Sequence, residues 1–463
     1  MTRRLALLLA ALVLLLAAPC LVAAESAPAA KPAEKKTIAC EPAPAELAQI
    51  AAEVAKDVEA IRGWKYKEPV KNAVCTPEQV RAYMTNEIDK HYPATKVQEI
   101  QAGLRMLGLI PETCDLRKTI LDLMQVQVEG FYDSDTKTLY LVKRSAASYK
   151  SLMQRTLIAH ELTHALDDQY VDLSKLIEEG ERREDRDMAH SAVAEGSATS
   201  TMTRYLLRAQ GSGEAGVSEL QDYMLQEAAR NKVFTDMPPY FQTMMASYIC
   251  GLNFLTKGNV LAMALPGGKD VGDEMLAAAK NPPESTHEIL HPEVYWDPAT
   301  RERPVVVSDK EVEAAIAVPG HEVVGRDVYG ELNAAVLTTP KDRKPNLMTM
   351  GLATYWTNPV ASAWVGDRFF LLAPRTGEAP KDLKAAKAVW VTFWNSPDAR
   401  DNFVKTYDAC VPPAKRASWK FGNMGAVFFY NFTDAERAAA EKKLEAKPPK
   451  CTRDGKPWAP WAL

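Results

Sequence analysis

The spacing of apolar residues between Ser151 and Tyr170 predicts an amphipathic helix. Apolar side chains recur there at intervals of three and four residues, at Met153, Leu157, Ile158, Leu162, Ala165 and Leu166. This spacing places side chains on one face of an α-helix. Neither Pro nor Gly interrupts the run. We therefore expect a continuous helix with one buried stripe.

A strand-like pattern of apolar residues appears just before this helix. Phe131-Tyr132 and the run from Thr138 to Val142 are rich in residues that favour strands, and Asp133-Ser-Asp-Thr-Lys137 between them has the composition of a turn. The pattern predicts a β-hairpin that leads into the helix. A purely structural hairpin and a hairpin that binds substrate both fit this pattern.

The pattern over the rest of the chain indicates an α+β fold. Residues 45–127 are mainly helical by pattern, and prolines break them into segments. Beyond Pro298 to Pro304, strand-like runs alternate with helical ones. Two of these runs make strand-then-helix units, which suggests a weak internal duplication: Val389–Trp394 with Pro397–Tyr407, and Ala426–Phe432 with Asp434–Leu444. Four tryptophans accompany apolar runs, so we expect them in the core: Trp364, Trp390, Trp394 and Trp419.

The start of the chain predicts export. Arg3-Arg4 precede an apolar run from Leu5 to Leu16, and Val22-Ala23-Ala24 suits cleavage of a signal peptide after Ala24. The apolar run is short for a membrane span. Pro19 directly before Cys20 argues against a lipoprotein. We expect a periplasmic or secreted protein with no membrane span after cleavage, in which residues 25–44 form a disordered linker.

Charge and cysteine content refine this picture. The net charge of −4 offers no basic surface for nucleic acid. Removal of Cys20 leaves an even number of cysteines in an exported chain, which favours disulfides. Local pairing predicts Cys75 with Cys114 and Cys410 with Cys451, leaving Cys40 with Cys250. None of these spacings is typical of a structural zinc cluster.

The predicted helix carries the strongest chemical signal, because His160-Glu161-Leu162-Thr163-His164 matches the zinc-hydrolase motif HExxH. Residues four apart lie on one helix face, so both imidazoles can reach one metal ion. Glu161 lies beside them, where it can take a proton from water. Asp168 lies one turn beyond His164, so it either makes a hydrogen bond or ion pair near the site or ends the helix in solvent.

A catalytic zinc needs a third protein ligand, and Glu195 is our candidate. It lies within a helical run from Met188 to Ala209, in the segment Ala194-Glu-Gly-Ser-Ala-Thr199. Small residues around one carboxylate let that helix approach another closely, and Gly196 inside a helix suggests a packing or site reason. A partly exposed helical glutamate is the alternative. His190 is a rival ligand, but it lies off the face of Glu195.

These motifs resemble those of the gluzincins, zinc metallopeptidases with HExxH and a glutamate on a second helix. The chain is also similar to a group of mostly uncharacterised exported bacterial proteins over roughly residues 125 to 300. That similarity rests on four strings: Gly130-Phe-Tyr-Asp133, Leu139-Tyr-Leu-Val142, Ala159-His-Glu-Leu-Thr-His-Ala-Leu-Asp-Asp-Gln169 and Glu195-Gly196.

The resemblance implies a zincin-like catalytic domain at residues 128–300, between the helical N-terminal region and a smaller α+β domain at 301–463. It implies that His160, His164 and Glu195 bind one zinc ion and that Glu161 is the general base. An edge strand of the hairpin would align a peptide substrate. Some gluzincins place an Asp one turn after the third ligand. Thr199 stands there in this chain, which makes Asp168 the expected orienting group.

A further segment, Asn281 to Tyr295, contains two of the seven histidines and recurs in the group that the chain resembles. Ser285 and Glu288 have capping-box spacing, which predicts a short helix that Pro292 ends. Hydrolysis through a tetrahedral intermediate needs a donor for the oxyanion. We expect that donor to be His291, then Tyr295, then His287. The alternative is a loop beneath the site in which His291 makes structural hydrogen bonds.

The sequence therefore predicts an exported zinc metallopeptidase that acts on peptides or proteins. Two other functions remain open. One is an exported zinc amidase that cuts cell-wall crosslinks. The other is a secreted binding protein that keeps the fold without catalysis, although an intact base at Glu161 speaks against it.

Overall fold

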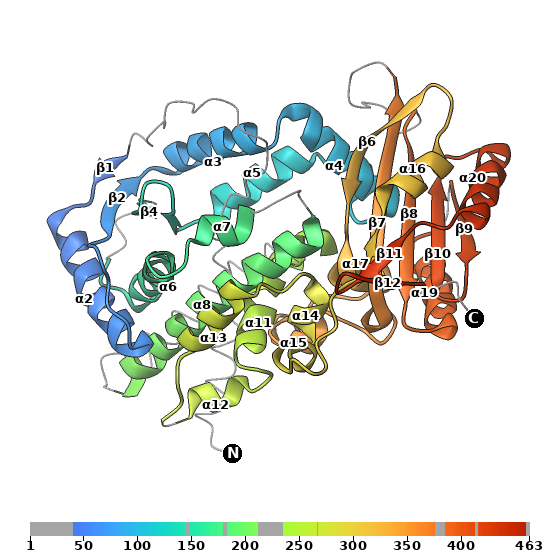
Figure 1. Cartoon of the computed structure of the whole chain (residues 1–463). Coiled ribbons are helices and arrows are strands. Elements are labelled where there is room, and N and C mark those ends of the chain that lie inside the picture. Colours follow the sequence, from blue (N-terminus) through green and yellow to red (C-terminus); the bar gives the residue numbers. More distant parts are fainter. Residues whose placement is uncertain are drawn as a thin grey trace.

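A computed structural model describes residues 40–143, 149–178, 183–211, 235–265, 267–375, 385–412 and 415–459. Within these ranges the chain has the expected α+β fold, with many helices and small sheets (Figure 1). The expected signal peptide, residues 1–24, lies outside the described residues. Most of the expected linker at 25–44 does so too, but its last residues are part of a strand.

The first sheet contains the predicted hairpin. Its strand order is β1-β2-β4-β3, and β3 and β4 pair antiparallel while β2 and β4 run parallel. β3 is therefore an edge strand, next to the helix that carries the HExxH motif. The bounds are β1 (Glu41–Pro42), β2 (Lys71–Cys75), β3 (Gly130–Asp133) and β4 (Thr138–Val142).

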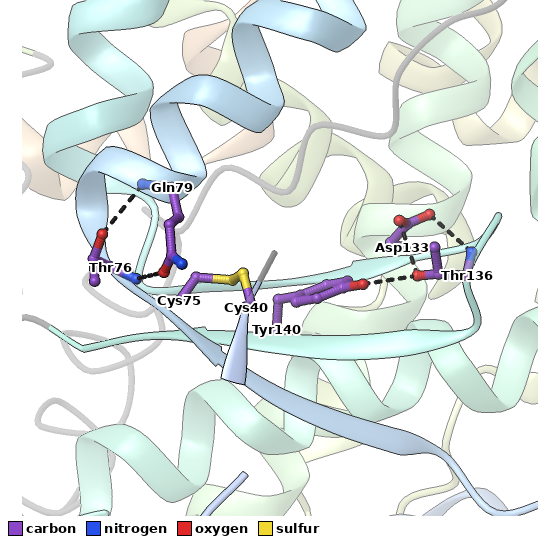
Figure 2. Close-up of a disulfide and its surroundings, with 7 residues drawn as sticks. All are labelled: Cys40, Cys75, Thr76, Gln79, Asp133, Thr136 and Tyr140. Atoms are coloured by element: carbon purple, nitrogen blue, oxygen red, sulfur yellow. Dashed lines mark hydrogen bonds between the residues drawn. A yellow bond between two sulfur atoms is a disulfide. The ribbon is translucent and has the colours of Figure 1, made fainter. Parts of the chain in front are cut away.

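A disulfide joins the residue before β1 to the end of the neighbouring strand β2. Cys40 and Cys75 are bonded, with their Cα atoms 4.8 Å apart, as Figure 2 shows. The pairing of β1 with β2 places them side by side, because Glu41 lies opposite Val74. The predicted pairs Cys75–Cys114, Cys410–Cys451 and Cys40–Cys250 are therefore wrong. The remaining four cysteines of the described residues are free thiols: Cys114, Cys250, Cys410 and Cys451.

Helices fill the N-terminal and central parts, and prolines separate several of them as the sequence indicates. The N-terminal helices are α2 (Ala45–Arg62), α3 (Pro77–His91), α4 (Ala94–Leu107) and α5 (Leu116–Gln127). The central helices are α6 (Leu152–Asp168), α7 (Leu173–Glu178), α8 (Glu184–Gly211), α10 (Pro239–Gln242), α11 (Met244–Leu255), α12 (Val260–Ala264), α13 (Gly272–Lys280), α14 (Thr286–Leu290) and α15 (Pro292–Trp296). None of the described helices has both the length and the apolar character needed to cross a membrane.

The C-terminal part is built on a five-stranded antiparallel sheet, at the right of Figure 1, with strand order β6-β7-β8-β10-β9. Its strands are β6 (His321–Asp327), β7 (Trp364–Pro374), β8 (Lys387–Trp394), β9 (Arg416–Phe421) and β10 (Gly425–Tyr430). A second, small sheet has the strand order β12-β11-β5. It pairs two strands near the C-terminus with β5, which precedes β6 in the chain. Its strands are β5 (Val306–Val307), β11 (Cys451–Arg453) and β12 (Lys456–Trp458).

Helices cover both faces of the five-stranded sheet. One face packs against α4, α17 (Gly330–Leu337) and α19 (Pro397–Cys410), and the other against α16 (Asp309–Ile316) and α20 (Asp434–Ala446). Both predicted strand-then-helix units are present, but α19 and α20 lie on opposite faces, which does not support a duplication. Of the four expected core tryptophans, Trp364, Trp390 and Trp394 are buried, whereas Trp419 is only partly buried, on the edge strand β9. Short helical turns complete this part: α18 (Leu347–Met350), η1 (Ala353–Tyr355) and η2 (Ala361–Ala363).

Candidate metal centre

The helix with the HExxH motif is α6, and it begins as the sequence predicts. Ser151 caps it, because its hydroxyl accepts a hydrogen bond from the backbone N–H of Gln154. The expectation of one buried stripe was wrong, since nearly every residue from Thr156 to Asp168 is buried. Helices α2 and α8 and strand β3 all contact α6. A helix enclosed in this way holds its polar side chains away from bulk water.

Three polar side chains converge at the middle of α6. The Nε2 atoms of His160 and His164 lie 3.2 Å apart. The Oε2 atom of Glu195, from α8, lies 3.2 Å from Nε2 of His160 and 3.6 Å from Nε2 of His164. All three residues are buried. The structure therefore brings together the three residues that the sequence singled out as ligands.

The donor set fits a metal ion. A tetrahedral zinc ion with metal–nitrogen distances of about 2.0–2.1 Å holds its ligand atoms about 3.3 Å apart, close to the three distances observed here. The Nδ1 atoms of His160 and His164 are buried and have no hydrogen-bond partner among the described residues, so the converging Nε2 atoms are the ones offered to an ion. Two imidazoles and a carboxylate suit zinc and neighbouring transition metals.

The charge of Glu195 dominates the electrostatics of this group. Burial by itself would lower the pKa of His164, but the adjacent Glu195 carboxylate raises it to about 9. Burial likewise opposes ionisation of Glu195, yet the two histidines keep the pKa of its carboxyl below the usual value. In a site with no metal bound, the carboxylate therefore attracts a proton onto the His164 imidazole, and a cation would take the place of that proton.

Small residues explain how Glu195 reaches the centre. Helix α8 packs closely against α11, and a Cβ atom added at Gly196 would lie 2.2 Å from the carbonyl carbon of Gly251. A Cβ atom at Gly251 would lie 1.9 Å from the carbonyl oxygen of Ala192. The expectation of a close helix approach is confirmed, although the partner is α11. This contact fixes the position of α8, the helix that carries Glu195.

Glu161, the motif glutamate, lies between α6 and the edge strand. Its Oε2 atom accepts a hydrogen bond of 2.9 Å from the backbone N–H of Tyr132 in β3. The side chain is fully buried. Tyr132 lies opposite Leu139 of β4, but its N–H bonds to Glu161 and not to β4. This N–H therefore points to the open edge of the sheet. The structure therefore places the candidate base at the edge of β3.

The two residues expected to orient a histidine have different surroundings. Asp168 accepts hydrogen bonds from the Tyr132 hydroxyl at 2.8 Å and from the Lys137 ammonium at 2.6 Å. It thus forms the ion pair that was one of its expected roles, but it fastens α6 to the hairpin rather than to a metal ligand. Thr199 is buried, and its hydroxyl has no partner among the described residues.

Arg62 and Asp167 are the functional neighbours that sequence reasoning missed. The Arg62 guanidinium, at the end of α2, is hydrogen-bonded to the carboxylate of Asp167 and to Asp270 at 2.7 Å. Ser197 donates to Asp167 at 2.5 Å, so α2, α6 and α8 meet in one buried network. Asp167 stood next to Asp168 in the sequence, but nothing local indicated that it, and not Asp168, would face Arg62.

An aromatic ring also packs against the centre. Tyr248 of α11 lies over the imidazole of His160, with ring centroids 5.9 Å apart and an interplanar angle of 28°. Tyr248 is buried, so it shields this side of the group from solvent. No motif singled it out. Only the apolar run of α11 that contains it was visible in the sequence.

The residues expected to donate to an oxyanion lie elsewhere. His287 and His291 both contact the carboxylate of Glu331, with Nδ1 of His287 at 2.5 Å and Nε2 of His291 at 3.0 Å. The hydroxyl of Tyr295 donates to the carbonyl of Asn281 at 2.6 Å. None of these contacts involves the His160 group. The alternative, in which His291 makes structural hydrogen bonds, agrees better with them.

The histidine segment holds a second signal that the sequence analysis overlooked. The predicted cap is present, since Ser285 accepts from the N–H of Glu288 and α14 spans Thr286–Leu290. The same residues, His287-Glu-Ile-Leu-His291, repeat the HExxH pattern. His287, His291 and Glu331 form a second group with the ligands to hold a metal ion, besides His160, His164 and Glu195.

Comparisons of the chain with protein-family models, with curated proteins and with solved structures gave no match.

Proposed function

We propose that this protein is a zinc-dependent hydrolase that cleaves amide bonds in peptides. One observation carries the proposal. Two imidazole nitrogens and a carboxylate oxygen from two helices meet within 3.2–3.6 Å of one another, with the motif glutamate next to them in the chain. The disulfide between Cys40 and Cys75 is consistent with an exported protein.

Zinc held by His160, His164 and Glu195 would lower the pKa of a bound water toward about 7 and polarise a substrate carbonyl. Glu161 would receive the proton of the attacking water and pass it to the leaving amine. Its hydrogen bond from the Tyr132 N–H fixes one oxygen of this carboxylate. Tyr248 and the surrounding helices exclude bulk water from the ligands, which strengthens the interactions of charges there.

A peptide is the substrate class that the surroundings favour. Strand β3 is an edge strand, and its Tyr132 N–H, which faces the open edge, bonds to Glu161. An extended chain could add to such an edge through backbone hydrogen bonds, with its scissile bond close to Glu161. This geometry supports hydrolysis of an extended peptide over cleavage of a cell-wall crosslink.

Glu161→Gln is the direct test. Because the amide cannot accept a proton but keeps the size of the side chain, we expect zinc content to be unchanged and hydrolysis of a peptide library to fall by roughly a hundredfold or more. Zinc is measured by mass spectrometry of the metal, and cleavage by the appearance of new termini. Glu53→Gln, at a half-buried position on α2, serves as the control and should retain full activity.

Two results would contradict the proposal. Full hydrolysis by Glu161→Gln would remove the glutamate from the mechanism. A wild-type protein that binds zinc yet cleaves cell-wall fragments and no peptide would assign the site to a different amide substrate.

A further inference from the structure

The second HExxH segment lies at the border between the central helices and the five-stranded sheet (Figure 1). Helix α14 presents His287 and His291, one turn apart. Glu331 comes from the first turn of α17, the helix that packs on the sheet. A ligand bound by these three side chains would therefore join the α14 segment to α17, which comes later in the chain.

We propose that His287, His291 and Glu331 bind a second divalent metal ion of the zinc class, separate from the centre at His160, and that this ion is structural. One nitrogen of each histidine and an oxygen of Glu331 lie within 4.8 Å of one another. The donor set, two imidazoles and one carboxylate, is the same as in the first centre and suits zinc.

The surroundings of these ligands resemble the outer shell of a metal site. The other ring nitrogen of His291, Nδ1, lies 3.5 Å from the carboxylate of Glu293. The hydroxyl of Thr357 donates to Oε1 of Glu331. Metal-binding histidines commonly donate their second nitrogen to a carboxylate, and metal-binding carboxylates are commonly hydrogen-bonded in this way. Both ligand types therefore have the partners that would hold them in place.

Buried negative charge gives an independent reason for a cation here. The Glu331 side chain is fully buried, and the carboxylates of Asp185 and Asp367 are buried beside the same helix start. Asp185 accepts from the N–H of Thr286, and a Cβ atom added at Gly330 would meet its Oδ1 atom at 1.7 Å. Oδ2 of Asp185 is buried without a hydrogen-bond partner.

Of these three carboxylates, Glu331 is the one that His287 and His291 contact. Asp367 instead accepts from the indole N–H groups of Trp364 and Trp390. A buried carboxylate is costly to keep charged, and a divalent ion held with the two histidines would offset the charge of Glu331.

A structural role follows from Glu288, the glutamate of this second motif. Its Oε1 atom accepts from the Arg301 guanidinium at 2.7 Å, and its Oε2 atom accepts from the N–H of Glu284 at 2.6 Å. One oxygen is thus held in a buried ion pair and the other by a backbone N–H, whereas Glu161 in the first motif faces an edge strand. Glu288 is therefore unable to act as a base, and an ion at this site would fasten α14 to α17.

The alternative is a pair of protonated imidazoles on one carboxylate, with no metal. Metal stoichiometry separates the two. The full mature chain is loaded with zinc, dialysed against metal-free buffer and analysed for zinc per chain. We expect two ions for the wild type, one for Glu331→Gln and one for His291→Gln. Glu195→Gln should also retain one, the ion at the second site. His190→Gln, a buried histidine outside both groups, should keep two.

Crystals of the wild-type protein grown with zinc give a test that does not depend on folding of the variants. Diffraction at the zinc absorption edge should show anomalous density between His287, His291 and Glu331. One zinc per chain, with density at His160 and none at His287, would overturn the proposal. So would two ions retained in Glu331→Gln. Neither result bears on whether the first centre hydrolyses peptides.

Discussion

His190, on the helix that carries Glu195, shows how burial changes the pKa of a histidine. Burial, and then the nearby Arg186, lower its pKa to about 4, and contacts with the Leu176 and Pro283 carbonyls offset this only in part. His190 is therefore neutral in the folded protein, although the sequence could present it as a rival metal ligand. Its place outside the His160 group follows from its position on another face of α8.

This shift predicts a pH dependence of stability. Because the pKa of His190 is lower in the folded chain than in the unfolded chain, the unfolded chain binds the extra proton between about pH 6.5 and pH 4. The free energy of unfolding should fall as the pH drops through that window, by on the order of 1–3 kcal/mol from this residue. Urea unfolding of the wild type and of His190→Gln at pH 7.5 and pH 4.5 measures it.

The wild type and His190→Gln should differ in how steeply their free energy of unfolding falls as the pH drops. His190→Gln has no titrating group at this position, so its stability should fall less over the same interval. Equal losses in both proteins would show that His190 titrates normally in the folded state. Loss of bound metal at low pH affects both proteins alike and cancels in the comparison.

At the scale of the elements, the contact between α8 and α11 positions the third ligand. Gly196→Ala should destabilise the protein by about 1–3 kcal/mol, because the added methyl group would overlap the backbone of Gly251. Displacement of α8 would also move Glu195, so zinc affinity should fall together with stability. Thermal unfolding and a zinc titration with a competing chelator measure the two effects.

Gly211→Ala is the matched control. Gly211 lies on the same helix, and a Cβ atom there would meet nothing within 4 Å. Alanine favours helices over glycine, so this change should leave stability equal or higher by up to about 1 kcal/mol. If Gly196→Ala behaved like Gly211→Ala, the close helix contact would not hold the ligand in place.

The elements also show which patterns sequence reasoning could interpret. The hairpin, α6 and the capped helix α14 were expected, because strand alternation, three-and-four spacing and a Ser285 cap are local signals. The single buried stripe of α6 was a wrong expectation. A helix surrounded by α2, α8 and a sheet buries polar faces as well, and the hydrophobic pattern alone does not show this.

At the scale of the whole molecule, the Cys40–Cys75 disulfide ties the first described residues to the sheet that borders the candidate active site. It closes a loop of 35 residues that contains α2, the source of Arg62. Cys40→Ser with Cys75→Ser should lower the free energy of unfolding by about 2–4 kcal/mol, because the unfolded chain regains the freedom of that loop. Chemical unfolding with and without a reductant measures it.

The reductant should destabilise the wild type and leave the double variant unchanged. Cys114→Ser, which removes a free thiol, should retain both the wild-type stability and its sensitivity to reductant. Wild-type protein that is insensitive to reductant while unfolded would mean that the bond does not form.

The sequence by itself determined the parts of this protein that depend on neighbours in the chain. Two histidines four residues apart share a helix face, a turn composition between β-prone runs makes a hairpin, and Ser before a short apolar segment caps a helix. Each of these follows from local geometry. The candidate ligands His160 and His164 and the candidate base Glu161 could be named for the same reason.

Only the tertiary structure decided which distant groups meet. It brought Glu195 to the histidines, paired Asp167 with Arg62 and turned Asp168 to the hairpin. It joined Cys40 to Cys75, and it placed His291 with Glu331, away from the first centre. The physical reason is that these contacts depend on how closely layers such as α8 and α11 pack, and such packing is a property of the assembled core rather than of any one segment.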